Sequence, residues 1–470
     1  MTLALKNAYQ QDRAEQVRLA SLVETFAEPL AEFEPLLVYA REIGKFAPSA
    51  SVGAVTEVSK ASPENSQPKY AQEVLTINPS SQKEPTKNNV VGIKTVILTI
   101  GDGDFESGFP VVMKIFKANE LFPVQQLIGN LPLIGNLPPA PDVYSSYDAW
   151  QLSGQYFSTS HDVSHRMVLR KISVTKFSSS ELKKNLEIFQ NIINNWLKSE
   201  SFLPCVDSLR RNLLPTDEVR VFIETKNQVL WRLPWHFWDF FQDYPKAEIA
   251  FSLPRYSRYT KIKKSTSRKN NTVRILGCLG ESIGINLDVD RSLLEQLPSA
   301  ETVFLVNPSR DQLFETLWNA EGWDIFYFAG SSASDSDGSN GQISLNPTDT
   351  LMANELKNAL EKAMGRGLKL AIFNSCDGLG IANQLANFGS LTTIVMRYRI
   401  PNEVAYTFLE HFLEAFSSGK SLYASVRETR ERLHGLEDTY PGASWLPVIF
   451  HNPAEAPPTW EPASYVSIFD

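Results

Sequence analysis

Five short, almost wholly apolar runs follow one another in the C-terminal part of the chain, and they restrict its fold more than any other feature. They cover residues 273–279, 302–306, 325–328, 368–373 and 391–396. The segments between them carry leucines at helical spacing, for example Leu293, Leu294 and Leu297. Strands that are apolar on both faces and alternate with helices predict an α/β fold, with a mainly parallel sheet covered by helices on both sides.

In a sheet of this kind, functional side chains gather beyond the carboxyl ends of the strands. The run 325–328 leads to Gly330 and Ser331, and the run 368–373 leads to Asn374, Cys376 and Asp377. The two strand ends at Ser331 and Cys376 are therefore where we expect the function to lie.

The rest of the chain is expected to divide by composition. The predicted parts are a helical tail (1–46), a flexible linker rich in Ser, Pro, Lys, Glu and Asn (47–89), a smaller α+β domain (90–260), a basic connector (261–271), the C-terminal domain (272–453) and a C-terminal tail (454–470). The turn-forming segment 101–108 between two β-rich runs predicts a hairpin in the smaller domain. A second hairpin is expected around Lys226 and Asn227.

Composition argues against several classes of function. A formal charge of −8 does not favour nucleic acid or an anionic membrane as partner. The three cysteines show no metal-binding spacing, and no run of 18 or more apolar residues suggests a membrane span, so we expect a cytoplasmic protein. Asp102, Asp104 and Glu106 lack the distant carboxylate of a calcium loop and are expected to form a turn. The sequence thus predicts no metal and no cofactor.

His236 is a possible catalytic base, because an imidazole titrates near neutral pH. It lies in the aromatic stretch Leu233-Pro-Trp-His-Phe-Trp-Asp239. A histidine in such surroundings is more often a packed, hydrogen-bonded core group, and that is the interpretation we favour.

Four motifs together resemble a bacterial CHAT domain, a caspase-like fold in the clan of caspases, separase and gingipains. They are Asp324-Ile-Phe-Tyr-Phe-Ala-Gly330, Asn374-Ser-Cys-Asp-Gly378, Ile394-Val-Met-Arg397 and Trp445-Leu-Pro-Val-Ile449. The resemblance covers about residues 270–453, and Leu233-Pro-Trp235 and residues 252–255 are similar to the upstream part of the same family. It implies a caspase-like sheet that carries a cysteine and a histidine as a peptidase dyad.

Cys376 matches the position of the nucleophile in this family, whereas the position of the histidine is occupied by Ser331. A cysteine thiol is mostly protonated at neutral pH and needs an adjacent imidazole to become a thiolate. A serine hydroxyl cannot act as that base, so the dyad is broken. The resemblance also implies that Gly330, Asn374 and Asp377 contact a substrate, with Asp377 facing a basic side chain, although Asp377 could instead stabilise the start of the next helix.

Two functions follow from this. The first is a pseudo-peptidase that binds polypeptide partners in recognition or regulation, with Cys376 either weakly reactive or a buried structural residue. The alternative is an active cysteine endopeptidase that cleaves after basic residues. Its base would be a relocated histidine, or Ser331 would replace a natural histidine by engineering. The histidines available are His161, His165, His236, His411, His434 and His451.

Overall fold

The computed structural model describes residues 92–118, 126–128, 132–160, 179–254, 272–281, 286–335, 339–386, 389–398 and 400–461. The predicted tail 1–46, the linker 47–89 and the basic connector 261–271 lie outside these residues. All described residues belong to one compact unit, Val91–Asp470.

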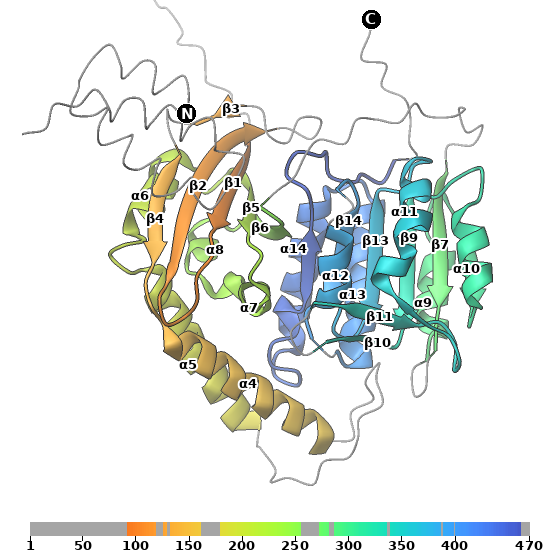
Figure 1. Cartoon of the computed structure of the whole chain (residues 1–470), viewed down its shortest axis with the longest axis horizontal. Coiled ribbons are helices and arrows are strands. Elements are labelled where there is room, and N and C mark those ends of the chain that lie inside the picture. Colours follow the sequence, from red (N-terminus) through yellow and green to blue (C-terminus); the bar gives the residue numbers. More distant parts are fainter. Residues whose placement is uncertain are drawn as a thin grey trace, which may run out of the picture. The chain divides into compact units, whose positions relative to one another are not determined.

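One large mixed sheet organises this unit (Figure 1). Its strands, in spatial order, are β3 (Gln126–Leu127), β2 (Phe109–Ala118), β1 (Ile93–Ile100), β5 (Glu218–Glu224), β6 (Ala247–Ser252), β15 (Pro447–Phe450), β14 (Thr392–Met396), β13 (Leu370–Ser375), β9 (Ile325–Gly330), β7 (Val273–Leu279) and β8 (Ala300–Val306). A further strand, β4 (Leu133–Leu137), also pairs with β2. Pairing is parallel from β1 through β5 and β6 to β15, and again from β14 through β13, β9 and β7 to β8. The prediction of a mainly parallel sheet is confirmed.

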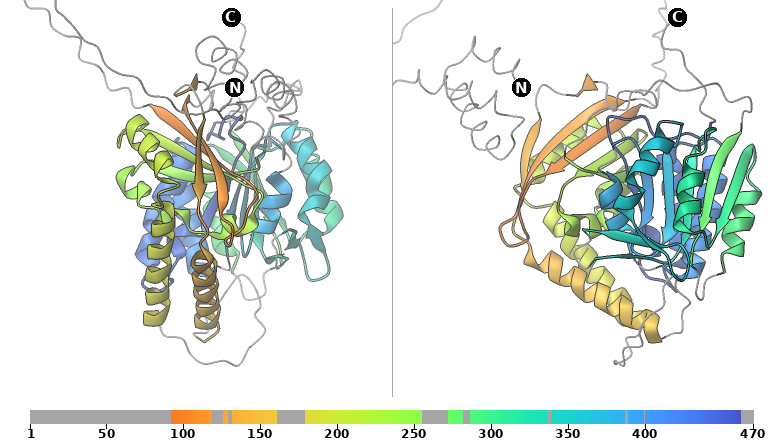
Figure 2. Two further views of the ribbon diagram at one scale, coloured as in Figure 1. Left: turned by 60° about the vertical axis from the view of Figure 1, so that its left-hand side comes forward. Right: turned by 45° about the vertical axis from the view of Figure 1, so that its right-hand side comes forward.

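Helices cover both faces of this sheet, as its apolar strands require (Figure 2). Successive strand residues point to opposite faces. Accordingly Phe373 packs into one apolar cluster with α10 (Arg310–Leu317), α11 (Lys357–Met364) and α12 (Leu379–Ala386). Ile372 packs into the other cluster with α9 (Asp288–Glu295), α13 (Asn402–Ser417) and α14 (Leu422–Leu433). The predicted α/β class, with helices on both sides, is therefore confirmed.

The shorter elements complete the unit. Upstream of the C-terminal block lie α4 (Pro141–Ser160), α5 (Ser179–Leu197), α6 (Leu203–Asn212), α7 (Gln228–Arg232), η2 (Trp235–Phe237) and α8 (Phe240–Asp243). Within that block lie η3 (Ala353–Leu356), η4 (His434–Leu436), η5 (Ala443–Trp445) and a separate small sheet of β10 (Ser332–Ser334), β11 (Gly341–Ser344) and β12 (Thr350–Met352). None of the helices that the structure describes is long and apolar enough to span a membrane.

The first predicted hairpin is present, and the second prediction was wrong. Strands β1 and β2 pair in antiparallel fashion, and in their connection the Asp104 carboxylate accepts the amide hydrogens of Glu106 and Ser107 at 3.0 and 2.6 Å. Residues 228–232 instead form helix α7, because the Asn227 side chain caps it by accepting the amide hydrogen of Val229 at 2.9 Å. Strand β5 then finds parallel partners on both sides, β1 and β6.

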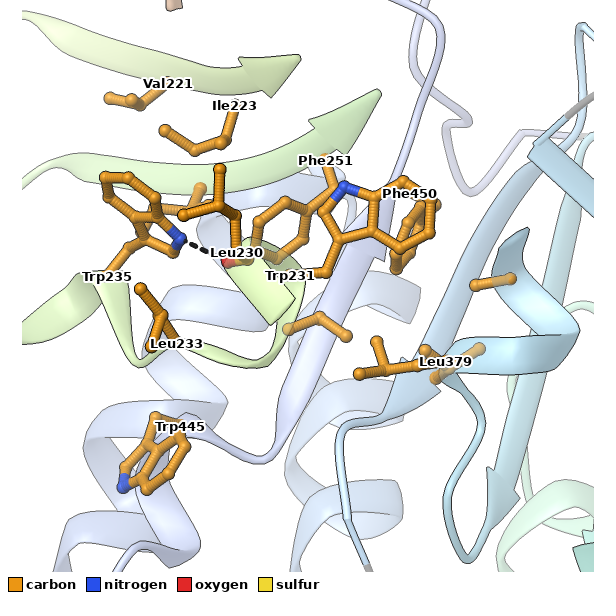
Figure 3. Close-up of a cluster of buried hydrophobic side chains, with 14 of the residues drawn as sticks. Val221, Ile223, Leu230, Trp231, Leu233, Trp235, Phe251, Leu379, Trp445 and Phe450 are labelled. Carbon is orange, nitrogen blue, oxygen red and sulfur yellow. Dashed lines mark hydrogen bonds between the residues drawn. The ribbon is translucent and has the colours of Figure 1, made fainter. Parts of the chain in front are cut away.

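Residues that precede the segment 261–271 in the sequence share one sheet and one core with residues that follow it. Strand β6 lies before this segment and β15 after it, and the two pair through Ile449 with Ala250 and Phe450 with Phe251. Figure 3 shows the core beneath this junction, where Trp231 of α7 packs edge-on against Phe450 at a centroid distance of 5.1 Å. The division of the chain into two domains at residues 261–271 stays a prediction.

Candidate functional site

The carboxyl ends of β9 and β13 bring the two predicted positions to one edge of the sheet. Gly330 and Ser375, the last residues of these neighbouring strands, lie opposite each other in the parallel register. Ser331 and Cys376 are the residues that follow. Gly330 has a φ of 151°, and a Cβ there would lie 3.1 Å from the carbonyl oxygen of Glu281, so glycine suits this position.

The Cys376 side chain points into the interior. It is 0% exposed and belongs to the apolar cluster formed with α13 and α14. Its Sγ lies 4.0 Å from the carbonyl oxygen of Ile400, just before α13. The thiol is therefore surrounded by packed side chains, which is a common environment for a structural cysteine.

Serines of the small sheet hold the turn that follows Cys376. The Ser332 hydroxyl lies 2.8 Å from Ser375 Oγ and contacts the carbonyl oxygen of Cys376. The Ser334 hydroxyl donates to the carbonyl oxygen of Asp377 at 2.6 Å and accepts the amide hydrogen of Gly380 at 3.0 Å. Strand β10 is thus attached to this turn by its side chains. Ser332 and Ser334 occupy alternate positions after a buried strand, and this spacing is the sequence signal that could have predicted these contacts.

Backbone amides after Cys376 donate to the end of β14. The amide of Gly378 donates to the carbonyl oxygen of Met396 at 2.8 Å, and that of Asp377 to Tyr398 at 3.4 Å. A tetrahedral intermediate would need such amides aimed at the developing oxyanion. In this conformation these two amides serve the fold of the turn instead.

Asp377 lies at the surface end of this turn and is half-buried, with a left-handed φ of 48°. Arg232 of α7 interacts with it electrostatically. Burial opposes the charged form of Arg232, but the charges of Tyr147 and Asp377 outweigh this and raise the pKa of Arg232. A basic side chain of the chain itself therefore acts on the carboxylate that we expected to face a basic substrate group.

Asn374 lies in the interior, contrary to the expectation that it contacts a substrate. It is 0% exposed, and its amide nitrogen donates to Tyr327 Oη at 3.1 Å, to the carbonyl oxygen of Ala405 at 3.1 Å and to Asp290 Oδ1 at 3.3 Å. These contacts join β13 to β9, α9 and α13. Asn374 thus fixes the strand end that precedes Cys376.

His236 is a packed core group, as we favoured. Its Nε2 lies 2.7 Å from Glu248 Oε1, and Arg430 Nε lies 3.1 Å from the other oxygen of that carboxylate. Burial lowers the pKa of His236 to about 4. Glu248 lies on β6, three strands from β13 in the sheet order, which corresponds to about 14 Å. His236 therefore does not serve Cys376 as a base.

The other described histidines also lie away from Cys376. His451 contacts Thr392 at 2.7 Å, and Thr392 pairs with Leu370 at the opposite end of β13. His411 lies six residues beyond Ala405 on α13, about 9 Å further along the helix axis. His434 is exposed on η4. His161 and His165 are outside the described residues.

The buried environment of His451 can be tested by the pH dependence of the free energy of unfolding. Burial lowers its pKa from 6.5 to about 4. The unfolded chain therefore takes up a proton between pH 6.5 and 4 that the folded chain does not, so stability falls as pH falls through this window. We expect His451→Asn to reduce the loss of unfolding free energy between pH 7 and 4.5 by about 2–3 kcal/mol, measured by urea denaturation. The exposed control is His434→Asn. If this variant and His451→Asn lose the same unfolding free energy between pH 7 and 4.5, the prediction is contradicted.

No metal centre is evident in the described part of the chain, where no group of three or more His, Cys, Asp or Glu side chains is placed to hold an ion.

A mainly parallel sheet covered by helices on both faces, with a cysteine directly after one of its central strands, defines an α/β protein. The model of the CHAT domain family matches residues 195–470, more than half of the sequence, and the chain therefore belongs to the CHAT domain family. The match begins in α5 and so includes elements upstream of the predicted C-terminal domain.

Comparison with individual proteins adds little to the family assignment. No curated protein matches the chain. Among solved structures, the Drosophila initiator caspase Dronc is similar at 12% sequence identity, over 45% of this chain and 95% of that chain, with a TM-score of 0.31. We draw no argument from a structural similarity of this size.

Proposed function

We propose that this CHAT-family protein is a pseudo-peptidase, which binds a polypeptide for recognition or regulation and does not hydrolyse it. The observation that carries the proposal is the full burial of the Cys376 thiol. It is supported by Ser331, which stands where the family resemblance implies a histidine. A serine cannot take the proton of the thiol, and a thiol packed in an apolar cluster is not presented to a peptide bond.

Two further features support the proposal. The amides of Asp377 and Gly378 are hydrogen-bonded to Tyr398 and Met396, and the four described histidines lie elsewhere. The edge of the sheet nevertheless remains partly accessible, because Ser331, Asp377 and Tyr398 are half-buried. A polypeptide can bind at such an edge without being cleaved.

The alternative, an active endopeptidase that cleaves after basic residues, keeps one point in its favour. The carboxylate of Asp377 is half-buried next to Cys376, where it could meet a basic side chain. Its base would have to be His161 or His165, which lie outside the described residues. The double variant His161→Ala/His165→Ala tests this possibility, since it should abolish any cleavage that depends on either imidazole.

We expect Cys376→Ala to leave polypeptide affinity within about two-fold of the wild type, because the thiol lies in the interior and not at the accessible edge. The measurement is fluorescence anisotropy with labelled peptides that contain arginine, lysine, aspartate or their uncharged counterparts. The same peptides, incubated with wild-type protein and analysed by mass spectrometry, should remain intact. Cleavage by the wild type that is lost in Cys376→Ala would overturn the pseudo-peptidase proposal.

A further inference from the structure

Three arginines are buried in the described part of the chain, and one of them differs from the other two. Arg220 and Arg274 are 1% and 6% exposed, and each lies near a carboxylate, Glu218 at 3.6 Å and Glu321 at 3.1 Å respectively. Arg397 is 0% exposed and has no carboxylate within 4.0 Å among the described residues. A buried charge is costly unless it is paired, so Arg397 requires an explanation.

Only one of the three guanidinium nitrogens of Arg397 makes a hydrogen bond within the described residues. Nη1 donates to the carbonyl oxygen of Leu233, and the group lies over the rings of Phe251 and Trp445 at 5.6 and 5.5 Å. Nε and Nη2 have no hydrogen-bond partner among the described residues. These two nitrogens form one edge of the planar group and present two parallel N–H donors. Such an edge matches the two oxygens of a carboxylate.

The immediate surroundings add donors. The indole rings of Trp150 and Trp445 lie 4.7 Å apart, and neither indole nitrogen has a hydrogen-bond partner in the described structure. Tyr398 contacts both rings, at 5.7 and 5.6 Å. Burial without a counter-charge also lowers the pKa of Arg397 to about 10. We call Arg397, Trp150, Trp445 and Tyr398 the Arg397 cluster; an anion would complement its donors.

This cluster lies next to the Cys376 turn. The carbonyl oxygen of Tyr398 accepts the amide hydrogen of Asp377, and Arg397 directly follows Met396, whose carbonyl oxygen accepts the amide hydrogen of Gly378. Tyr398 is half-buried, so it connects the interior of the cluster with the accessible edge of the sheet. Because Arg397 is 0% exposed, a group bound at that edge reaches its guanidinium only if a neighbouring side chain moves. Tyr398 is the half-buried member of the cluster, and its hydroxyl donates to the carbonyl oxygen of Arg232 at 2.6 Å.

We propose that the Arg397 cluster is a carboxylate-binding site, which accepts an aspartate or glutamate side chain of the bound polypeptide through the Nε–Nη2 edge of Arg397. The inference rests on the proposed function, because it identifies the chemistry of the partner at the same edge. It differs from the expectation of a basic partner group at Asp377, since a carboxylate is recognised here by the arginine that directly follows β14.

The test compares two labelled pentapeptides, Gly-Ser-Asp-Ser-Gly and Gly-Ser-Asn-Ser-Gly with blocked ends, by calorimetry and by the indole ¹H–¹⁵N spectrum of the wild-type protein. We expect the aspartate peptide to bind at least about 10-fold more tightly and to shift the Trp445 signal, since a charge-assisted bidentate pair is lost with asparagine. The Trp445 signal is assigned with Trp445→Phe. Equal affinity of the two peptides, with no change at Trp445, would overturn the site without the need for any variant.

Variants of Arg397 and Arg274 test whether the preference for the aspartate peptide depends on Arg397. Arg397→Lys keeps the charge but loses the paired N–H edge, and should weaken binding of the aspartate peptide by about 10- to 100-fold. Arg274→Lys is the matched control, because Arg274 is also buried and stacked on an indole, Trp323 at 4.6 Å, but has its own carboxylates. It should bind the peptide as the wild type does. A preference for aspartate that survives in a folded Arg397→Lys protein would also contradict the assignment.

Sodium acetate, titrated at constant ionic strength, distinguishes the source of the carboxylate. If acetate shifts the Trp445 signal in an Arg397-dependent manner but the two peptides bind equally, the site binds small carboxylates and its assignment to a polypeptide is wrong. Each of these binding measurements is repeated with the Cys376→Ala protein. Cleavage by the wild type would then overturn the proposed function, while an aspartate preference in Cys376→Ala would still support the carboxylate site.

Discussion

Ser331→His is expected to gain peptide cleavage of at least about 100-fold over the wild-type background, near the lower end of the 10²- to 10⁴-fold range of general acid–base catalysis. The register supports this, because Ser331 directly follows Gly330, which lies opposite Ser375 next to Cys376. An imidazole at this position would be at the end of the neighbouring strand. We expect the gain to stay near the lower end of this range, because the thiol is buried and the amides of Asp377 and Gly378 already donate hydrogen bonds to Tyr398 and Met396.

The measurement is turnover of a fluorogenic arginine peptide. Ser331→Ala should show no gain, and the double variant Ser331→His/Cys376→Ala should lose whatever Ser331→His acquires. If the wild type is already as active as Ser331→His, a different base is present and the pseudo-peptidase proposal is wrong. If a folded Ser331→His is as inactive as Ser331→Ala, residue 331 is not the position of the missing base.

Glu248→Ala is expected to lower the free energy of unfolding by about 3–5 kcal/mol, the cost of breaking a buried ion pair by removing one partner. Glu248 is 1% exposed and contacts His236, Arg430 and the amide of Ile249. Burial alone would raise the pKa of this carboxyl, but Arg430 and His236 outweigh it and lower the pKa to about 2. Without the carboxylate, the Arg430 guanidinium would be left largely buried and uncompensated.

Urea denaturation at neutral pH checks this value. Glu431→Ala is the matched control, because Glu431 is 65% exposed and its pair with Arg427 spans 3.9 Å at the surface, so we expect a change below about 0.5 kcal/mol. Replacing all three buried partners together, by His236→Phe, Glu248→Met and Arg430→Met, should cost much less than Glu248→Ala alone, because no charge is then left buried. A cost below about 1 kcal/mol for Glu248→Ala would show that this buried group is not an important part of the core.

Much of the fold could be predicted from local patterns. Apolar runs and helical leucine spacing sufficed for the mainly parallel sheet and its two helical layers, because these depend on which faces of each element are apolar. The same reasoning placed Ser331 and Cys376 at one edge, since parallel strands end at the same side of a sheet. The second hairpin was mispredicted because the Asn227 side chain caps a helix there, a local signal that the β-rich composition around it obscured.

The amino-acid sequence by itself determined which residues follow the two strand ends, Ser331 after β9 and Cys376 after β13. Tertiary structure decided what those residues meet. The thiol faces Ile400, and Glu248 contacts both His236 and the distant Arg430. Arg397 is buried without a carboxylate of its own among the described residues. The physical reason is that burial and pairing depend on contacts between distant segments, whereas the spacing of apolar residues reports only on neighbours along one helix or strand.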